Sequence, residues 1–201
     1  EDEAESYDRQ HLRLQSRQND LIEKLAEVNP NLIVILQGGG VMELPWFEKV
    51  PSLLFVGLAG QAIGEGCLDL LLGKTNPSGK LAESWPMMLE DVPSGAGFGQ
   101  RFNTPYLESI FVGYRYYSSA KKEVRFPFGH GLSYTDFEFS DLSLSQSELK
   151  PGETLEVRVY IKNRGGRTGK EVAQLYVSAP KSVLFKAERE LKDFAKVSLE
   201  P

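Results

Sequence analysis

The pattern of apolar and polar residues changes once along the chain, close to residue 136. Before that point, helix-like and strand-like segments follow one another, at residues 18–28, 31–36, 51–57 and 61–72. The two strand-like segments are continuous apolar runs rich in β-branched residues, a composition typical of parallel strands buried on both faces. The order helix, strand, strand, helix therefore predicts an α/β domain with a mainly parallel sheet over residues 1–105.

From Phe137 onward, apolar and polar residues alternate with a period of two, as in strands with one buried face. Strands are predicted near residues 137–145, 154–163, 171–178 and 191–199. Short alternating strands separated by turn residues are typical of an all-β sandwich, but such a sandwich needs about seven strands. Residues 136–201 are therefore predicted to form an incomplete β-sandwich.

A connector rich in aromatic residues, residues 106–135, lies between these two parts. An aromatic ring buries roughly 150 Å² or more when it packs, so this many rings are not expected to remain in water. We expect the connector to hold the β-sandwich against the α/β domain through its aromatic side chains, namely Phe111, Tyr114, Tyr116, Phe126 and Phe128. A sugar-binding platform is the alternative function for the same rings.

Charge and composition exclude several classes of function. The formal net charge is −5 and the basic residues are scattered, whereas nucleic-acid binders need a concentrated basic face. No stretch approaches the ~20 apolar residues of a membrane span. The single cysteine, Cys67, cannot form an internal disulfide and is expected to be a buried, inert thiol. His11 and His130 lack ligand spacing, so we expect neither a metal nor a cofactor.

Two local features could contact a ligand. The triple glycine at residues 38–40 follows a predicted strand, but it lacks the dinucleotide-binding pattern. We therefore expect a tight turn there. Trp46, in the following loop, is a candidate sugar-contacting residue because an aromatic face suits the C–H surface of a pyranose. A packed tryptophan is the alternative interpretation.

Acidic residues crowd the start of the chain. By composition, this cluster is a solvated charge run, and nothing local distinguishes one carboxylate from another. The cluster consists of Glu1, Asp2, Glu3, Glu5 and Asp8.

Longer motifs, in order along most of the chain, resemble the C-terminal part of glycoside hydrolase family 3 enzymes of the β-glucosidase type. They are residues 5–9 (ESYDR), 29–36 (NPNLIVIL), 41–46 (VMELPW), 60–64 (GQAIG), 76–81 (NPSGKL), 110–117 (IFVGYRYY) and 126–134 (FPFGHGLSY). The segments 163–177 and 190–197 resemble the family's fibronectin type III-like domain. The resemblance implies part of an α/β sandwich followed by a partial fibronectin type III-like sandwich.

The resemblance also implies a retaining glycosidase. Glu5 matches the glutamate that acts as acid/base from the α/β sandwich, while the aspartate nucleophile belongs to a TIM-like barrel that this sequence lacks. Departures from the family pattern are Ser6 and Ser109, each in place of glycine, and Gly40 in place of proline. Glu3 and Glu1 are the fallback candidates for the acid/base, because the loop varies in length.

We therefore expect a fragment of a longer polypeptide, since the chain starts at Glu1 without Met and stops at Pro201 just after a strand-like run. Its expected partners are a β-glucoside or oligosaccharide substrate and the missing barrel, with neither nucleic acid nor a membrane. The fragment alone is expected to be inactive. A β-xylosidase of the same family and a non-catalytic structural or carbohydrate-binding module remain the alternatives.

Overall fold

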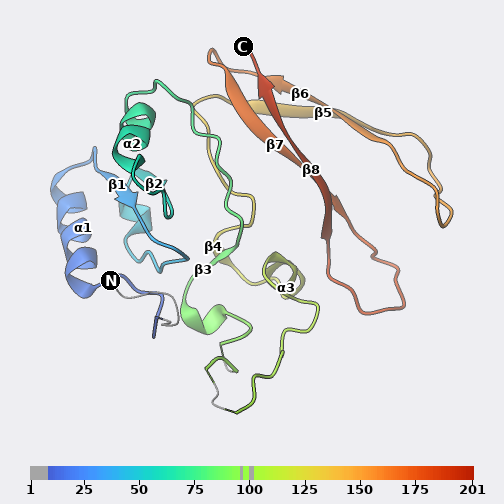
Figure 1. The fold of residues 1–201 in the computed structure, drawn as a ribbon, viewed down its shortest axis with the longest axis horizontal. Helices are drawn as coiled ribbons and strands as arrows, with labels where there is room; N and C mark the ends of the chain where they lie inside the picture. Colours follow the sequence, from blue (N-terminus) through green and yellow to red (C-terminus); the bar gives the residue numbers. More distant parts are fainter. Residues whose placement is uncertain (1–8, 96, 100–101) are drawn as a thin grey trace.

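The computed structural model describes residues 9–95, 97–99 and 102–201 (Figure 1). Helices and short strands occupy the part before residue 127, and two long antiparallel hairpins make up the part after residue 136. This is the predicted order of an α/β domain followed by a β domain. Among the described residues, no helix is both long enough and apolar enough to cross a membrane.

A parallel pair of strands forms the centre of the α/β part. Strand β1 (Ile33–Leu36) pairs with β2 (Ser52–Phe55), and helices α1 (Ser16–Val28) and α2 (Ile63–Leu71) precede and follow the pair. The parallel pairing confirms the prediction, but burial on both faces is wrong for β1. Val34 and Leu36 are buried, whereas Ile33 and Ile35 are 51% and 42% exposed. The second face of β1 is therefore only partly covered.

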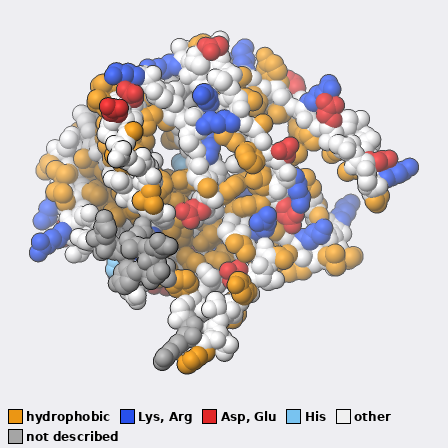
Figure 2. All heavy atoms as spheres, in the orientation of Figure 1, with side chains coloured by type: hydrophobic (Ala, Val, Ile, Leu, Met, Phe, Trp, Pro, Cys, Tyr) orange, Lys and Arg blue, Asp and Glu red, His pale blue; other side chains and the backbone are white. Residues whose placement is uncertain are grey.

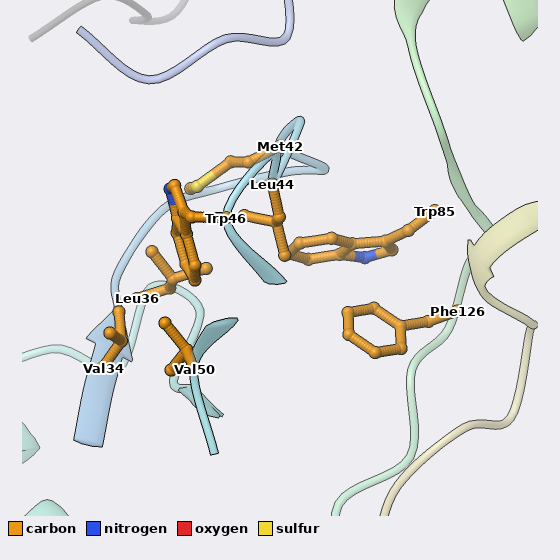
Figure 3. Close-up of a cluster of buried hydrophobic side chains, with 8 residues drawn as sticks. All are labelled: Val34, Leu36, Met42, Leu44, Trp46, Val50, Trp85 and Phe126. Atoms are coloured by element: carbon orange, nitrogen blue, oxygen red, sulfur yellow. The ribbon is translucent and has the colours of Figure 1, made fainter. Parts of the chain in front are cut away.

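The hydrophobic core lies on the buried face of this pair. Its two largest members, Trp46 and Trp85, have almost no exposed surface, and Leu44 lies between them in Figure 3. Helix α1 contributes Ile22 and Ala26 to its edge. The buried members of the core are Val34, Leu36, Met42, Leu44, Trp46, Val50, Trp85 and Phe126.

The aromatic connector contacts both parts of the molecule through Phe111, Tyr114 and Phe126, three of the five rings considered for this role. Phe126, on strand β4 (Val124–Phe126), meets Trp85 edge to face with ring centroids 5.7 Å apart. Tyr114, on helix α3 (Tyr114–Ser119), meets Tyr176 of the β domain edge to face at 5.7 Å. Phe111 contacts Phe185 at 4.8 Å. Edge-to-face geometry is favourable for aromatic rings, so these pairs join the connector to both neighbours.

Short elements complete the α/β part. They are the 3₁₀ turns η1 (Phe47–Lys49) and η2 (Leu89–Asp91) and strand β3 (Trp85–Pro86), which pairs antiparallel with β4.

The β domain consists of two antiparallel pairs. Strand β5 (Phe137–Leu144) pairs with β6 (Val157–Asn163), and β7 (Gly169–Val177) pairs with β8 (Glu190–Leu199). All four strands lie where the period-two pattern predicts them. Much of their apolar surface is exposed, as at Phe139, Leu142, Leu144 and Phe194. Figure 2 shows how hydrophobic side chains spread over one face of the whole molecule.

A polar interface fixes the turn at residues 73–81 against the β domain. Asn76 Nδ2 donates to the Thr168 carbonyl oxygen at 3.1 Å, and Lys196 Nζ donates to the Ser78 carbonyl oxygen at 2.9 Å. The Arg167 guanidinium donates to the Gly73 carbonyl oxygen at 2.7 Å. These bonds join segments about ninety or more residues apart, so they link the two domains directly.

Candidate functional site

The expected acid/base, Glu5, lies outside the residues that the structure describes, as do Glu1 and Glu3. The structure does describe the end of its motif, starting at Arg9. Three residues separate Glu5 from Arg9 in the sequence. The surroundings of Arg9 are therefore the part of this motif that the structure describes.

Arg9 is held against the loop that follows β1. One terminal nitrogen of its guanidinium, Nη2, donates to the carbonyl oxygen of Val41 at 2.9 Å, in a partly buried position. Val41 follows the glycine turn at residues 38–40, which continues directly from β1. Ligands of open α/β sheets bind outside the carboxyl ends of the strands, so this is the edge where a functional site is expected.

The chain after Arg9 runs along the same loop. The backbone nitrogen of Glu43 donates to the Leu12 carbonyl oxygen at 2.9 Å, and Arg13 and Glu43 form an isolated parallel bridge. The Glu43 carboxylate accepts a bond from the backbone nitrogen of Leu89 at 3.1 Å, at the start of η2. Residue Glu43 of this loop is thus hydrogen-bonded both to the segment after Arg9 and to the η2 turn.

A second carboxyl group lies within electrostatic reach of Arg9. Partial burial raises the pKa of the Glu83 carboxyl above its ordinary value, and the positive charge of Arg9 opposes that rise. Nothing in the sequence distinguishes Glu83, because its raised pKa comes from burial in the folded chain and the opposing charge of Arg9 lies 74 positions earlier.

Trp46, the expected sugar-contacting residue, lies inside the core. Its exposed fraction is 0%, and its indole nitrogen donates to Asn19 Oδ1 at 2.9 Å (Figure 3). The ring therefore links the loop after β1 to helix α1. In the structure it has no exposed face against which a sugar could stack.

A groove of about 400 Å³ lies between the aromatic connector and the β domain. Its aromatic rings are already engaged with each other, since Tyr114 stacks on Phe128 at 5.0 Å and meets Tyr176 at 5.7 Å. The Tyr114 hydroxyl accepts a hydrogen bond from the backbone nitrogen of Leu191 at 2.7 Å. These contacts favour a packing role for the connector over a sugar platform.

Among the described residues, Arg9, loop 38–43 and Glu83 lie together at the end of the expected acid/base motif. The motif that ends at Arg9 and the departure at Gly40 are both apparent in the sequence, but nothing in the sequence connects them. Only the fold brings position 9 against position 41.

Comparison with known proteins assigns both parts of the chain. The family described as "Glycosyl hydrolase family 3 C-terminal domain" matches residues 1–134, and "Fibronectin type III-like domain" matches residues 171–201. The chain is 47% identical over 200 residues to thermostable beta-glucosidase B of Acetivibrio thermocellus, and 41% identical over 205 residues to probable beta-glucosidase I of Aspergillus flavus. Each alignment covers 99% of this chain, but only 26% and 24% of the relative.

Solved structures show the same similarity. The beta-glucosidase from Kluyveromyces marxianus in complex with glucose superposes with a TM-score of 0.91 and 40% identity, over 98% of this chain and 24% of that one. Beta-glucosidase 3B from Thermotoga neapolitana, in complex with glycerol, gives 0.86 and 42%, over 94% and 28%. The chain thus spans about a quarter of the length of the curated relatives it matches.

Proposed function

This chain belongs to glycosyl hydrolase family 3, and on that premise we propose that it is the C-terminal part of a retaining β-glucosidase, with Glu5 as its acid/base. The remainder of such an enzyme would supply a TIM-like barrel with the aspartate nucleophile. The substrate would be a terminal β-D-glucosyl residue. The proposal is supported by the similarity to β-glucosidases over 99% of the chain.

One structural observation carries the proposal for the site. The motif that contains Glu5 ends at Arg9, and the Arg9 guanidinium is bonded to the Val41 carbonyl oxygen beside the carboxyl end of β1. Arg9 thereby holds the described end of the motif against the loop that follows β1. This position suits a motif whose glutamate would act on a substrate held mainly by another domain.

The chemistry would divide between two carboxyl groups. Glu5, as a neutral acid, would protonate the glycosidic oxygen while the barrel aspartate, about 5 Å away, attacks the anomeric carbon. In the second step, ionised Glu5 would deprotonate the water that hydrolyses the glycosyl-enzyme. Glu5 needs a pKa near neutrality for both tasks, and burial beside a second carboxylate in the closed cleft would raise it.

Because the nucleophile would come from the barrel, the 201-residue chain alone should not hydrolyse an aryl β-glucoside. The test compares this chain with the full-length polypeptide that contains it, at equal molar concentration. Turnover by the chain alone that disappears in Glu5→Gln would contradict the proposal.

The acid/base assignment is tested in the full-length polypeptide with Glu5→Gln, and with Glu3→Gln as the matched control. General acid catalysis contributes roughly 10²–10⁴-fold, so Glu5→Gln should lower kcat/KM for phenyl β-glucoside by that order. The 2,4-dinitrophenyl β-glucoside, whose leaving group needs no protonation, should retain much more of its rate of glycosyl-enzyme formation. If Glu3→Gln shows this pattern and Glu5→Gln does not, Glu5 is not the acid/base.

A further inference from the structure

His130 lies where the aromatic connector meets both domains. The Leu81 nitrogen donates to the His130 carbonyl oxygen, and the Gly129 nitrogen donates to the Leu81 carbonyl oxygen, each at 2.8 Å. A Cβ atom added at Gly129 would lie 2.6 Å from the side-chain amide of Gln174 on β7. The backbone at His130 is therefore held against the turn at residues 73–81 and against the β domain at the same time.

The imidazole ring of His130 is half-buried at this boundary. It stacks on Phe126, with ring centroids 4.8 Å apart and an angle of 20° between the ring planes. Burial, followed by the positive charge of Lys80, lowers the pKa of the ring. Both effects disfavour the imidazolium, because it would lose water and lie near a second cation.

The charged groups around His130 come from the elements packed against its segment. The turn at residues 73–81 supplies Lys80, whose Nζ binds the Glu171 carboxylate of β7 and the carbonyl oxygen of Gly131, the residue after the histidine. Strand β8 supplies Lys196, which donates to the same turn. The other charged residues of these elements are Arg125, which pairs with Glu48, Lys74, which pairs with Asp69, Lys170 and Glu83.

Protonation of His130 changes the charge balance at this boundary. With a neutral imidazole, the Lys80 ammonium and the Glu171 carboxylate balance each other, and both are largely buried. An imidazolium adds a second cation beside Lys80 and no further anion. Repulsion between two cations is stronger where water is partly excluded than in bulk water. The repulsion acts on Lys80, the residue that ties the turn to Gly131 and to β7.

We propose that His130 is a pH-sensitive switch at the boundary between the two domains: the neutral imidazole leaves the Lys80–Glu171 pair in place, and the imidazolium repels Lys80 and weakens the contact. Because the closed boundary holds the pKa of His130 below 6.5, opening the boundary favours proton uptake. The contact is therefore complete above pH 6.5 and weakens as the pH falls through the folded pKa. This role is independent of the proposed acid/base.

Two backbone amides of the β domain report on the boundary, because they donate across it. The Glu188 nitrogen donates to Ser119 Oγ at 3.0 Å, and the Leu191 nitrogen donates to the Tyr114 hydroxyl at 2.7 Å. Hydrogen exchange of the peptide 188–191, measured by mass spectrometry in the full-length polypeptide, therefore follows opening of the boundary. The peptide 194–198, which pairs with β7 inside one hairpin, is the internal reference.

The experiment compares about pH 7.5 with about pH 5, after correction for intrinsic exchange rates. In the wild type, protection of peptide 188–191 should fall about threefold or more, and that of peptide 194–198 by less than about twofold. His130→Gln, which stays neutral, should remove this difference. The matched control His11→Gln, which replaces the other histidine, should behave like the wild type.

The same acid-induced loss in His130→Gln would overturn the proposal, since Glu83, whose pKa is raised, would then be the titrating group. An equal loss in both peptides of the wild type, or no loss in either, would also overturn it. If His130→Gln does not fold, Lys80→Met provides the test. There the imidazolium faces Glu171 without a competing cation, so acid should no longer lower the protection of peptide 188–191. A persistent loss in Lys80→Met contradicts the switch.

Discussion

Lys80 and Glu171 form an ion pair across the domain boundary. Lys80 Nζ lies 2.9 Å from one carboxylate oxygen of Glu171 on β7 and 3.1 Å from the other, and it also donates to the Gly131 carbonyl oxygen at 2.6 Å. The two side chains are only 17% and 14% exposed. This pair therefore joins the turn before Leu81, the end of the connector and the β domain at one point.

Removing one member of this pair should destabilise the protein. Glu171→Gln leaves the Lys80 ammonium in a largely buried place without its counter-charge, so we expect the free energy of unfolding to fall by roughly 1–3 kcal/mol. The control is Glu156→Gln, which breaks the exposed pair with Arg158 and should cost about 0.5 kcal/mol or less. Urea unfolding measures the free energy of unfolding of both variants. Equal decreases in the two variants would refute the special role of the boundary pair.

Gly131 and Gly79 meet so closely that only one of them tolerates a side chain. A Cβ at position 131 would lie 2.1 Å from the Gly79 carbonyl oxygen, whereas a Cβ at position 79 meets nothing within 4 Å. Gly131→Ala should therefore force the backbones apart and lower stability by about 1–3 kcal/mol or more. Gly79→Ala should change it by less than about 0.5 kcal/mol. Thermal unfolding distinguishes the two, and a neutral Gly131→Ala would contradict the contact.

The ring of His130 should titrate below its ordinary range. It stacks on Phe126 with centroids 4.8 Å apart, and burial, followed by the charge of Lys80, lowers its pKa from 6.5. Because the unfolded chain binds the proton more readily, the stability linked to His130 is complete above pH 6.5 and is lost as the pH falls through the folded pKa.

Proton NMR measures this titration directly, since the chain has only two histidines and His11→Gln assigns the signals. Lys80→Met should move the pKa of His130 upward, while Lys192→Met, at an exposed position of β8, should leave it unchanged. A His130 pKa at or above 6.5 in the wild-type protein would contradict the structure.

Replacing Trp46 separates packing from ligand contact. Since the ring is fully buried and bonded to Asn19, Trp46→Phe should lower the free energy of unfolding by about 2 kcal/mol or more through lost volume and a lost hydrogen bond. In the full-length polypeptide, KM for an aryl β-glucoside should change little. A raised KM with unchanged stability would instead support the expected sugar contact.

The sequence pattern predicted the positions of most helices and strands, but not which of their faces are buried. The strands of the β domain were predictable because residues such as Val157 and Ile161 alternate with polar neighbours, and a period of two reflects the strand itself. The exposure of Ile33 and Ile35 was not, because an apolar run looks the same whether or not another segment covers its second face.

At the candidate site, too, only part could be predicted from the sequence. Residues 5–9 could be identified from their resemblance to a family motif, because such a motif is local. The bond from Arg9 to Val41 could not be predicted, because a guanidinium can donate to the backbone carbonyl of any residue. The residue type at position 41 therefore carries no signal of this bond. The pKa of Glu83 is raised by burial, and the charge of Arg9 opposes that rise. Both effects depend on the tertiary structure, so the sequence could not reveal them.

Because of its two buried tryptophans, fluorescence and circular dichroism report on different halves of this chain. Trp46 and Trp85 are its only tryptophans, and both lie in the α/β core, so indole emission reports on that half of the molecule alone. The circular dichroism of the four long strands reports mainly on the other half. If the boundary contacts couple the two halves, both signals should change at the same denaturant concentration. A gap between the two midpoints would measure how far each half unfolds without the other.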